Sequence, residues 1–511
     1  MVFQDLSEDN IRSIFSFCDI YAVVAMSRTN IYLHRLTLEK LVWVDLVEDL
    51  RRRGFIDGRS RAEIQAQSQE ELVGLVKALL TGPKSWTAPA LPKAPKALGG
   101  TRAPRPAPSH AEIPTQITLH PSGIWSSKKN EAKLIAGGEY VLLNSITLEC
   151  WSVHDDRLVW AYEKLAGSFV LEFDADIQEG GESATIIVYA RSWTGNGTDQ
   201  GQVHILQLDF RTGISTSLLC NVFLTTDLDD LQCQAVKICG NTACANIRDD
   251  TLPSETQSYC ILINWETKSH LKLGSNTLGS PFLVNLIPNH ILVLTNNRAG
   301  FPEIRVINIA AFSDYWQLAD SSPFSLPTTD VSDIEAAVCE SIIFGSCGRF
   351  QGWPRELYAY ESPLEAGTYR IWVIISGYSG SPSKKHAVLC SYRLSLMGNG
   401  IIWQQRTAAN ADPTLNCAGI TYSGHIRRYN SKSDGYSIFA PGNLDRAVEQ
   451  ILPDSVTYAP VSPYSGALAY ATNGALVVSF FKWCVVTLAF LTVIDRSTTG
   501  GDDGMRYPRS S

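Results

Sequence analysis

The chain has 511 residues, of which 45% are hydrophobic and 18% are charged, and this composition excludes a chain that is disordered throughout. Its 43 basic and 51 acidic residues give a net charge of −8, which argues against general binding to nucleic acid or to anionic lipid. At roughly 100–200 residues per domain, the length favours two or three domains.

The first ten residues, MVFQDLSEDN, contain no apolar run of the kind that a secretory signal needs. The 12 cysteines include no Cys-x-x-Cys pair. We therefore expect a cytoplasmic or nuclear protein whose cysteines are reduced and act as small apolar residues.

Residues 1–82 have the apolar spacing of helices. Ser7 is suited to cap a helix in which Ile11, Ile14, Phe15 and Cys18 form one apolar stripe. A weaker apolar stripe follows at 20–27, and a third helix is expected at 43–50. The last helix begins with the capping box at 68–71 and ends at 82–83. This pattern predicts a small helical domain.

Residues 83–114 are rich in proline, with eight prolines, five basic residues and one acidic residue. Such a segment favours extended backbone and cannot build a core. It is interpreted as a linker between domains, and the alternative is a ligand for a proline-binding module.

From 115 to 482 the sequence alternates between apolar and polar residues, in short runs separated by turns. Similar units recur about every 40–60 residues, as in 132–163 and 186–213. This recurrence predicts an all-β domain of the β-propeller class with six to eight blades, and a pair of β-sandwiches is the alternative. None of the 12 tryptophans is followed by Asp, so the Trp-Asp repeat signature is absent. The strand at 476–481 is suited to close the ring by pairing with the first blade.

The segment from Gly474 to Ile494 has 21 residues with one charge, Lys482, which is long enough to span a bilayer. Its Val, Phe, Thr and Ile content favours the alternative of two buried β-strands. We expect residues 483–511 to be a hydrophobic segment followed by a disordered polar tail.

No sequence motif indicates catalysis. The Gly377-Tyr378-Ser379-Gly380 run is one residue short of a nucleophile elbow, and there is no Walker A motif. The clustered acidic residues and the cysteines at 233–244 do not have the spacing of known metal sites. We therefore expect a protein that is not an enzyme and that needs no cofactor or metal.

The N-terminal helices resemble an F-box domain over about 45 residues. Residues 5–19 are similar to its first helix, and residues 20–30 are similar to its second. Tyr32, Leu36, Leu41 and Trp43 match its closing pattern. The usual Leu-Pro opening is Leu6-Ser7 here, so a serine that can cap the helix replaces the rigid proline.

The resemblance implies docking on the Skp adaptor of a cullin–RING ubiquitin ligase. Because about 45 residues are too few to bury both faces of three helices, we expect an apolar surface left for a partner. The candidate adaptor-binding residues are Leu6, Ile11, Ile14, Phe15, Leu36, Leu41 and Trp43. The alternative is that these side chains pack on each other and on the helices that follow.

The sequence therefore predicts a substrate receptor of an SCF-type ligase, in which the helical domain binds the adaptor and cullin scaffold and the propeller binds a target protein. Propeller ligands bind where loops of several blades converge. Candidate target-binding residues are aromatics and arginines expected in long loops, namely Trp193, Arg349, Trp353 and Arg355. The alternatives are a propeller hydrolase and a scaffold that joins no ligase.

Overall fold

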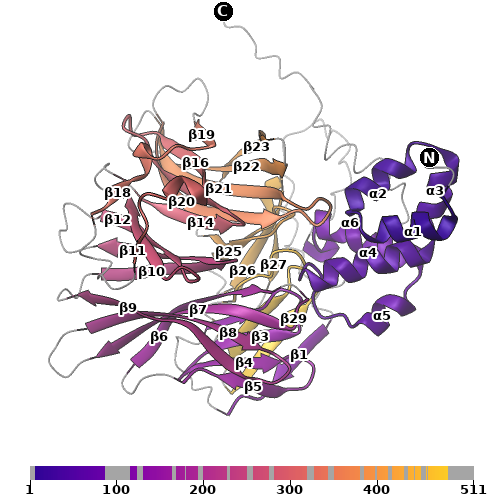
Figure 1. Ribbon diagram of the computed structural model, residues 1–511, viewed down its shortest axis with the longest axis horizontal. Coiled ribbons are helices and arrows are strands. Elements are labelled where there is room, and N and C mark those ends of the chain that lie inside the picture. The colour runs from indigo at the N-terminus through magenta and orange to yellow at the C-terminus, as the bar shows by residue number, and fades with distance from the viewer. Residues whose placement is uncertain are drawn as a thin grey trace, which may run out of the picture.

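The computed structural model describes residues 6–86, 115–122 and 131–481, with gaps at 164–167, 179, 194–198, 227–230, 250–256, 276–280, 319–326, 343–349, 380–384, 398–399, 412–416, 431–434, 442, 451–455, 457–458 and 473. Figure 1 shows the helices gathered on one side of a large β-domain. The predicted linker beyond Trp86 and the C-terminal segment from Lys482 lie outside the described residues.

Six α-helices form the helical region within residues 6–86: α1 (Glu8–Ser16), α2 (Ile20–Ser27), α3 (Ile31–Thr37), α4 (Lys40–Arg52), α5 (Arg61–Ala66) and α6 (Gln69–Thr81). The predicted caps are confirmed, because Ser7 accepts a hydrogen bond from the Asn10 amide and Ser68 forms a capping box with Glu71. Helix α5 was not predicted. It has a single buried residue, Ile64, and so carries no apolar stripe.

The described strands of the β-domain form seven sheets, which are the blades of a propeller. The propeller prediction is confirmed with seven blades. Blades 1 to 3 are β2–β5 (Glu131–Leu134, Tyr140–Asn144, Leu148–Ser152, Arg157–Ala161), β6–β9 (Ser168–Ile177, Ser183–Trp193, Asp199–Asp209, Ser215–Thr226) and β10–β13 (Leu231–Cys239, Thr242–Asp249, Gln257–Asn264, Ser269–Gly274), the last extended by β17 (Gln317–Leu318) and β18 (Thr329–Asp330).

Blades 4 to 7 complete the ring. They are β14, β15, β16 and β19 (Leu283–Ile287, His290–Asn296, Pro302–Asn308, Val338–Ser341), β20–β23 (Phe350–Glu361, Thr368–Ser379, Lys385–Met397, Gly400–Ala411), β24–β27 (Cys417–Ile420, Ile426–Asn430, Gly435–Ala440, Asn443–Gln450), and β28, β29 and β1 (Leu468–Thr472, Ala475–Phe480, Thr115–Leu119).

The seventh blade closes the ring with strands from both ends of the β-domain. Strand β1 pairs antiparallel with β29, from Thr115 opposite Phe480 to Leu119 opposite Leu476. This confirms the expectation that the 476–481 strand closes the propeller. Residues 475–480 of the membrane-length segment are therefore a strand, and no helix of the described residues is long and apolar enough to span a membrane.

The cores lie between neighbouring blades. In β3, Val141 and Leu143 pack toward blade 7, whereas Leu142 packs toward blade 2. Because both faces of an inner strand are covered, such strands read as continuous apolar runs rather than as a strict alternation.

The helical region packs directly on the propeller through polar contacts to three blades. Arg51 pairs with Glu139 of blade 1 at 2.9 Å, and Arg53 pairs with Glu361 of blade 5 at 2.8 Å. The Asp57 carboxylate accepts a hydrogen bond of 2.5 Å from Ser462, in the segment that leads into blade 7. These contacts fix the helical region at three positions around the ring.

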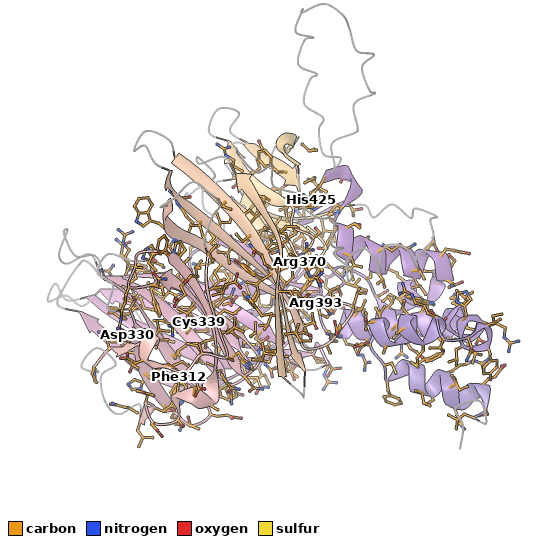
Figure 2. The ribbon with its side chains drawn as sticks, turned by 90° about the horizontal axis from the view of Figure 1, so that it is seen from above. Phe312, Asp330, Cys339, Arg370, Arg393 and His425 are labelled. Carbon is orange, nitrogen blue, oxygen red and sulfur yellow. The ribbon has the colours of Figure 1, made fainter. Side chains whose placement is uncertain are left out.

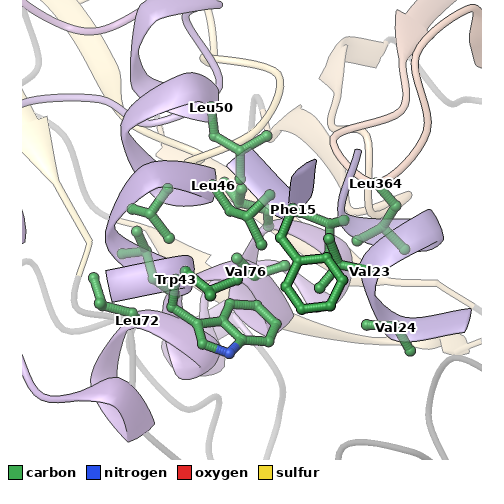
Figure 3. Packing of buried hydrophobic residues seen from close by; sticks show 14 of the residues in the cluster. Phe15, Val23, Val24, Trp43, Leu46, Leu50, Leu72, Val76 and Leu364 are labelled. Carbon is green, nitrogen blue, oxygen red and sulfur yellow. The ribbon is translucent and has the colours of Figure 1, made fainter. Parts of the chain in front are cut away.

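Apolar contacts strengthen this junction. Leu364, in the turn between β20 and β21, is buried in the core of the helical region beside Val23 and Phe15 (Figure 3). Phe55, which follows α4, makes an edge contact with the Tyr464 ring at 4.6 Å. The hydrophobic core of the helical region is thus completed by the propeller.

Trp86 is a further anchor. It lies in the short 3₁₀ turn Lys84–Trp86, where the proline-rich segment begins, and it is fully buried. Its indole ring packs among the cores of blades 6 and 7 and contacts Phe481 at 4.9 Å. The start of the predicted linker is therefore part of the propeller core.

Candidate functional site

Large apolar side chains are exposed on the helical region. Phe17 is 89% exposed, Ile31 is 88% exposed and Leu41 is 67% exposed, and Leu38 is also exposed. Phe17 ends α1, Ile31 begins α3, and the other two flank the turn between α3 and α4. We call these four residues the exposed apolar set. Exposed apolar side chains that form a contiguous patch are typical of an interaction surface.

The structure corrects which residues form this surface. Of the seven predicted adaptor-binding residues, Ile11, Phe15, Leu36 and Trp43 are buried in the core of the helical region. The expectation that they form an exposed surface was wrong, because α4, α6 and Leu364 of the propeller supply the apolar partners that 45 residues alone would lack (Figure 3).

The other three predicted residues are at least partly accessible. Leu6 and Ile14 are half-buried, and Leu41 belongs to the exposed apolar set. Phe17, Ile31 and Leu38 were missed. Their positions at helix ends, outside the apolar stripes, are the sequence signal that could have identified them.

An ion-pair network holds the helices behind this set. The Arg12 guanidinium binds Glu39 at 2.6 Å and Asp9 at 2.6 Å, and Arg35 binds Glu8 at 2.6 Å. The hydrogen bond to Arg12 lowers the pKa of the Glu39 carboxyl. The network joins α1 to α3 and to Glu39, which lies in the turn between α3 and α4.

A second polar feature lies on the inner strands of blades 1 to 3. The Asp174 carboxylate on β6 binds Lys133 on β2, and it lies 3.6 Å from the Lys237 ammonium on β10. Asp174 is buried, whereas the lysine side chains are 32% and 38% exposed. Because the first strands of propeller blades surround the central channel, this partial exposure indicates that the lysines line a channel that water can enter.

Two more carboxyl groups share this channel. Burial raises the pKa of Glu172 to about 7, with a further contribution from the neighbouring Glu131 carboxylate. Burial likewise raises the pKa of Glu131. Lys133 has a pKa well below its ordinary value, first because of burial and then because of the nearby Lys237 charge. Glu172 can therefore take up a proton near neutral pH, and none of these groups was predicted from the sequence.

The structure also contains a cavity at the junction and a groove on the propeller. A cavity of about 290 Å³ lies at the junction and is lined by arginines and glutamates of α4 and of blades 1 and 2, among them Arg51, Arg211, Glu139 and Glu182. A groove of about 650 Å³ lies outside β5 and β8, where the Tyr162 hydroxyl contacts the His204 ring at 2.5 Å. Burial lowers the pKa of His204. Among the described residues, no three His, Cys, Asp or Glu side chains are grouped so that they could hold a metal ion.

The structure describes the side chains of two of the four predicted target-binding residues, Trp353 and Arg355. Trp353 and Arg355 are exposed but lie in β20 rather than in a long loop, so the loop prediction was wrong for both. Pro354 is accommodated beside a bulge of this edge strand. Trp193 is the last residue of β7, and Arg349 lies outside the described residues.

Comparisons with known proteins identify no family for this chain. No protein-family model and no curated protein matches the chain. Among solved structures, it is similar to the WD40 domain of SCAP from fission yeast (TM-score 0.34, 10% identity, 69% of this chain and 84% of that chain). It is also similar to a streptogramin B lyase (TM-score 0.37, 10% identity, 72% and 98%) and to Kuenenia stuttgartiensis hydrazine synthase (TM-score 0.36, 9% identity, 68% and 94%).

Proposed function

We propose that this protein is a substrate receptor of an SCF-type cullin–RING ubiquitin ligase. In this proposal the helical region binds the Skp adaptor, the propeller binds the target protein, and the chain itself catalyses no reaction. The observation that carries the proposal is the exposed apolar set, which lies on the same 45 residues whose sequence resembles an F-box.

The accessible residues support adaptor binding by a surface different from the one expected. Burying an exposed Phe or Ile side chain against a partner is worth about 1.5–3 kcal/mol, so three or four such residues provide a usable interface centre. The neighbouring Arg12–Glu39 and Arg35–Glu8 pairs would form its polar rim. Ile11, Phe15 and Trp43 act indirectly, by holding the helices in place.

Co-purification of the full-length protein with the Skp adaptor tests the proposal. Phe17→Asp and Ile31→Asp are expected to abolish adaptor binding without loss of thermal stability, because both side chains are almost fully exposed. Ile214→Asp is the matched control, since Ile214 is 66% exposed on the propeller. Absence of adaptor binding by the unmodified chain would refute the proposal and would favour a scaffold that joins no ligase.

A propeller hydrolase is the second candidate, and the carboxyl groups of the channel favour it. A carboxyl with a pKa near 7 beside a second carboxylate is an arrangement used for general acid catalysis. A screen against glycans and peptides, with Glu172→Gln as the inactive control, would establish this candidate. Activity that survives Glu172→Gln would exclude the channel as its site.

A further inference from the structure

Three arginines form a row across blade 5, on the face that is turned toward blade 6. Arg370 on β21 lies directly opposite Arg393 on β22 in the antiparallel register. Arg406 is the extra residue of a bulge in β23, where Ser391 pairs with Thr407 and Tyr392 pairs with Gln405. We call these three residues the arginine row.

The face of the row follows from the pattern of its neighbours. Trp372 and Ile374 lie two and four residues after Arg370, on the same face of β21, and they pack with Ile420 and Ile426 of blade 6. Tyr369 and every second residue after it lie on the opposite face of β21, which packs toward blade 4. Arg370 extends over the Trp372 ring at 4.6 Å and lies 5.7 Å from the Tyr422 ring of blade 6. The row therefore borders the packed interface between blades 5 and 6.

This concentration of positive charge is incompletely neutralised. Directly opposed like charges destabilise an antiparallel pair. Among the described residues, one carboxylate pairs with the row: Glu365, which is itself buried and binds Arg393. Three guanidinium groups and one carboxylate leave a local charge of +2.

Arg406 shows most directly that the positive charge of the row is not fully neutralised. One terminal nitrogen of its guanidinium is buried and has no hydrogen-bond partner among the residues that the structure describes. Burial lowers the pKa of Arg406, and the Arg393 charge lowers it further. Burial likewise lowers the pKa of Arg370. A buried charged donor without a hydrogen-bond partner is destabilising, so an arrangement of this kind is stabilised by an anion.

The row lies at the end of blade 5 that faces the helical region. Figure 2 shows Arg370 and Arg393 on the side of the propeller near the helices, whereas Phe312, Asp330 and Cys339 lie on the far side. Glu365 belongs to the same turn as Leu364, which is buried in the core of the helical region. Tyr422, which Arg370 approaches, lies 5.7 Å from Tyr464, the partner of Phe55.

We propose that the arginine row binds a phosphate dianion, either free phosphate or the phosphate group of a small molecule, at the edge of the interface between blades 5 and 6. A dianion matches the local charge of +2, and the forked guanidinium group suits the oxygens of a phosphate. A single carboxylate would leave one positive charge unmatched. This site is independent of adaptor binding and of the channel.

The test is thermal unfolding and calorimetric titration of the full-length protein with sodium phosphate, against sodium chloride at equal ionic strength and pH. We expect saturable binding and a rise in Tm with phosphate only. Arg406→Gln is expected to weaken phosphate binding at least tenfold and to raise the Tm measured in chloride, because it removes one of three like charges. Arg157→Gln, at an exposed arginine of blade 1, is the matched control and keeps the response.

Further measurements separate the possible ligands and keep the test decisive. Glycerol phosphate that binds at least tenfold tighter than inorganic phosphate would assign the phosphate group of a small molecule, and the reverse order would assign free phosphate. If Arg406→Gln does not fold, Arg406→Lys is tested in its place. It keeps the positive charge but lacks the forked guanidinium group, so it should bind phosphate several-fold more weakly than the unmodified protein. Equal Tm curves in phosphate and chloride, or an unchanged phosphate affinity in Arg406→Gln, would overturn the inference.

Discussion

Asp57 provides the sharpest test of how the helical region is attached to the propeller. Its carboxylate is buried at the junction and accepts hydrogen bonds from the hydroxyl groups of Ser462 and Ser465. Within the described part of the chain, the second oxygen of this carboxylate has no hydrogen-bond partner. Burial outweighs these hydrogen bonds and raises the pKa of Asp57 from the ordinary value of 3.8 to about 6.

The magnitude follows from proton linkage. Each tenfold change in proton affinity corresponds to about 1.4 kcal/mol, so this pKa shift means that ionised Asp57 reduces the free energy of unfolding by about 3 kcal/mol. Because the folded-state pKa is the higher one, the loss is absent below about pH 3.8, develops up to about pH 6, and is complete at pH 7. Asp57→Asn, which carries no charge, should therefore gain stability relative to the unmodified protein as the pH rises.

The assay is denaturant unfolding of both proteins between pH 4.5 and pH 7.5. We expect the difference in the free energy of unfolding to change in favour of Asp57→Asn by about 2 kcal/mol over this range. Asp45→Asn is the matched control for the loss of one carboxylate, because Asp45 is exposed on α4. A difference that is constant with pH, whatever its sign, would refute the reasoning that Asp57 is ionised at the cost of burial.

Three other changes should have measurable effects on stability. Trp86→Ala should reduce the free energy of unfolding by about 3–5 kcal/mol, measured by denaturant unfolding, because the indole is fully buried. Gly54→Val should lower the Tm by several degrees, since φ is +78° and a Cβ would lie 2.8 Å from that of Ala136; an unchanged Tm would contradict the close approach. Lys133→Met should cost about 3–5 kcal/mol by leaving Asp174 with one partner, and Asp174→Leu added to it should restore part of that loss.

The propeller could be predicted from the sequence because each blade repeats the same local pattern. Strands such as 140–144 and 371–376 are recognisable from their apolar runs and flanking turns, and their recurrence defines the class. The number of blades could not be predicted. Strands in blade 5 are 12 or 13 residues long, whereas those in blade 1 are four or five, so the period varies along the chain.

The candidate sites were harder to predict, because burial depends on partners that are distant in sequence. Phe15 and Trp43 have the spacing of an exposed stripe in a 45-residue domain. Their core is completed by α6 and by Leu364, which lies more than 300 residues later. The channel charges are similar. Lys133, Asp174 and Lys237 lie on three separate blades, and no spacing rule relates them before the ring is closed.

The contacts between the helical region and the propeller also change how the proline-rich segment is interpreted. A linker between independent domains would control their separation, but Trp86 and Thr115, which bound the segment from 87 to 114, are both fixed on the propeller. The orientation of the helical region is instead set by its contacts with blades 1, 5 and 7, through Glu139, Glu361 and Ser462. Contacts at three separated positions prevent rotation about any one of them. If, as proposed, the exposed apolar set binds the ligase adaptor and the propeller binds a target protein, the junction itself would hold the propeller at a fixed orientation to the ligase.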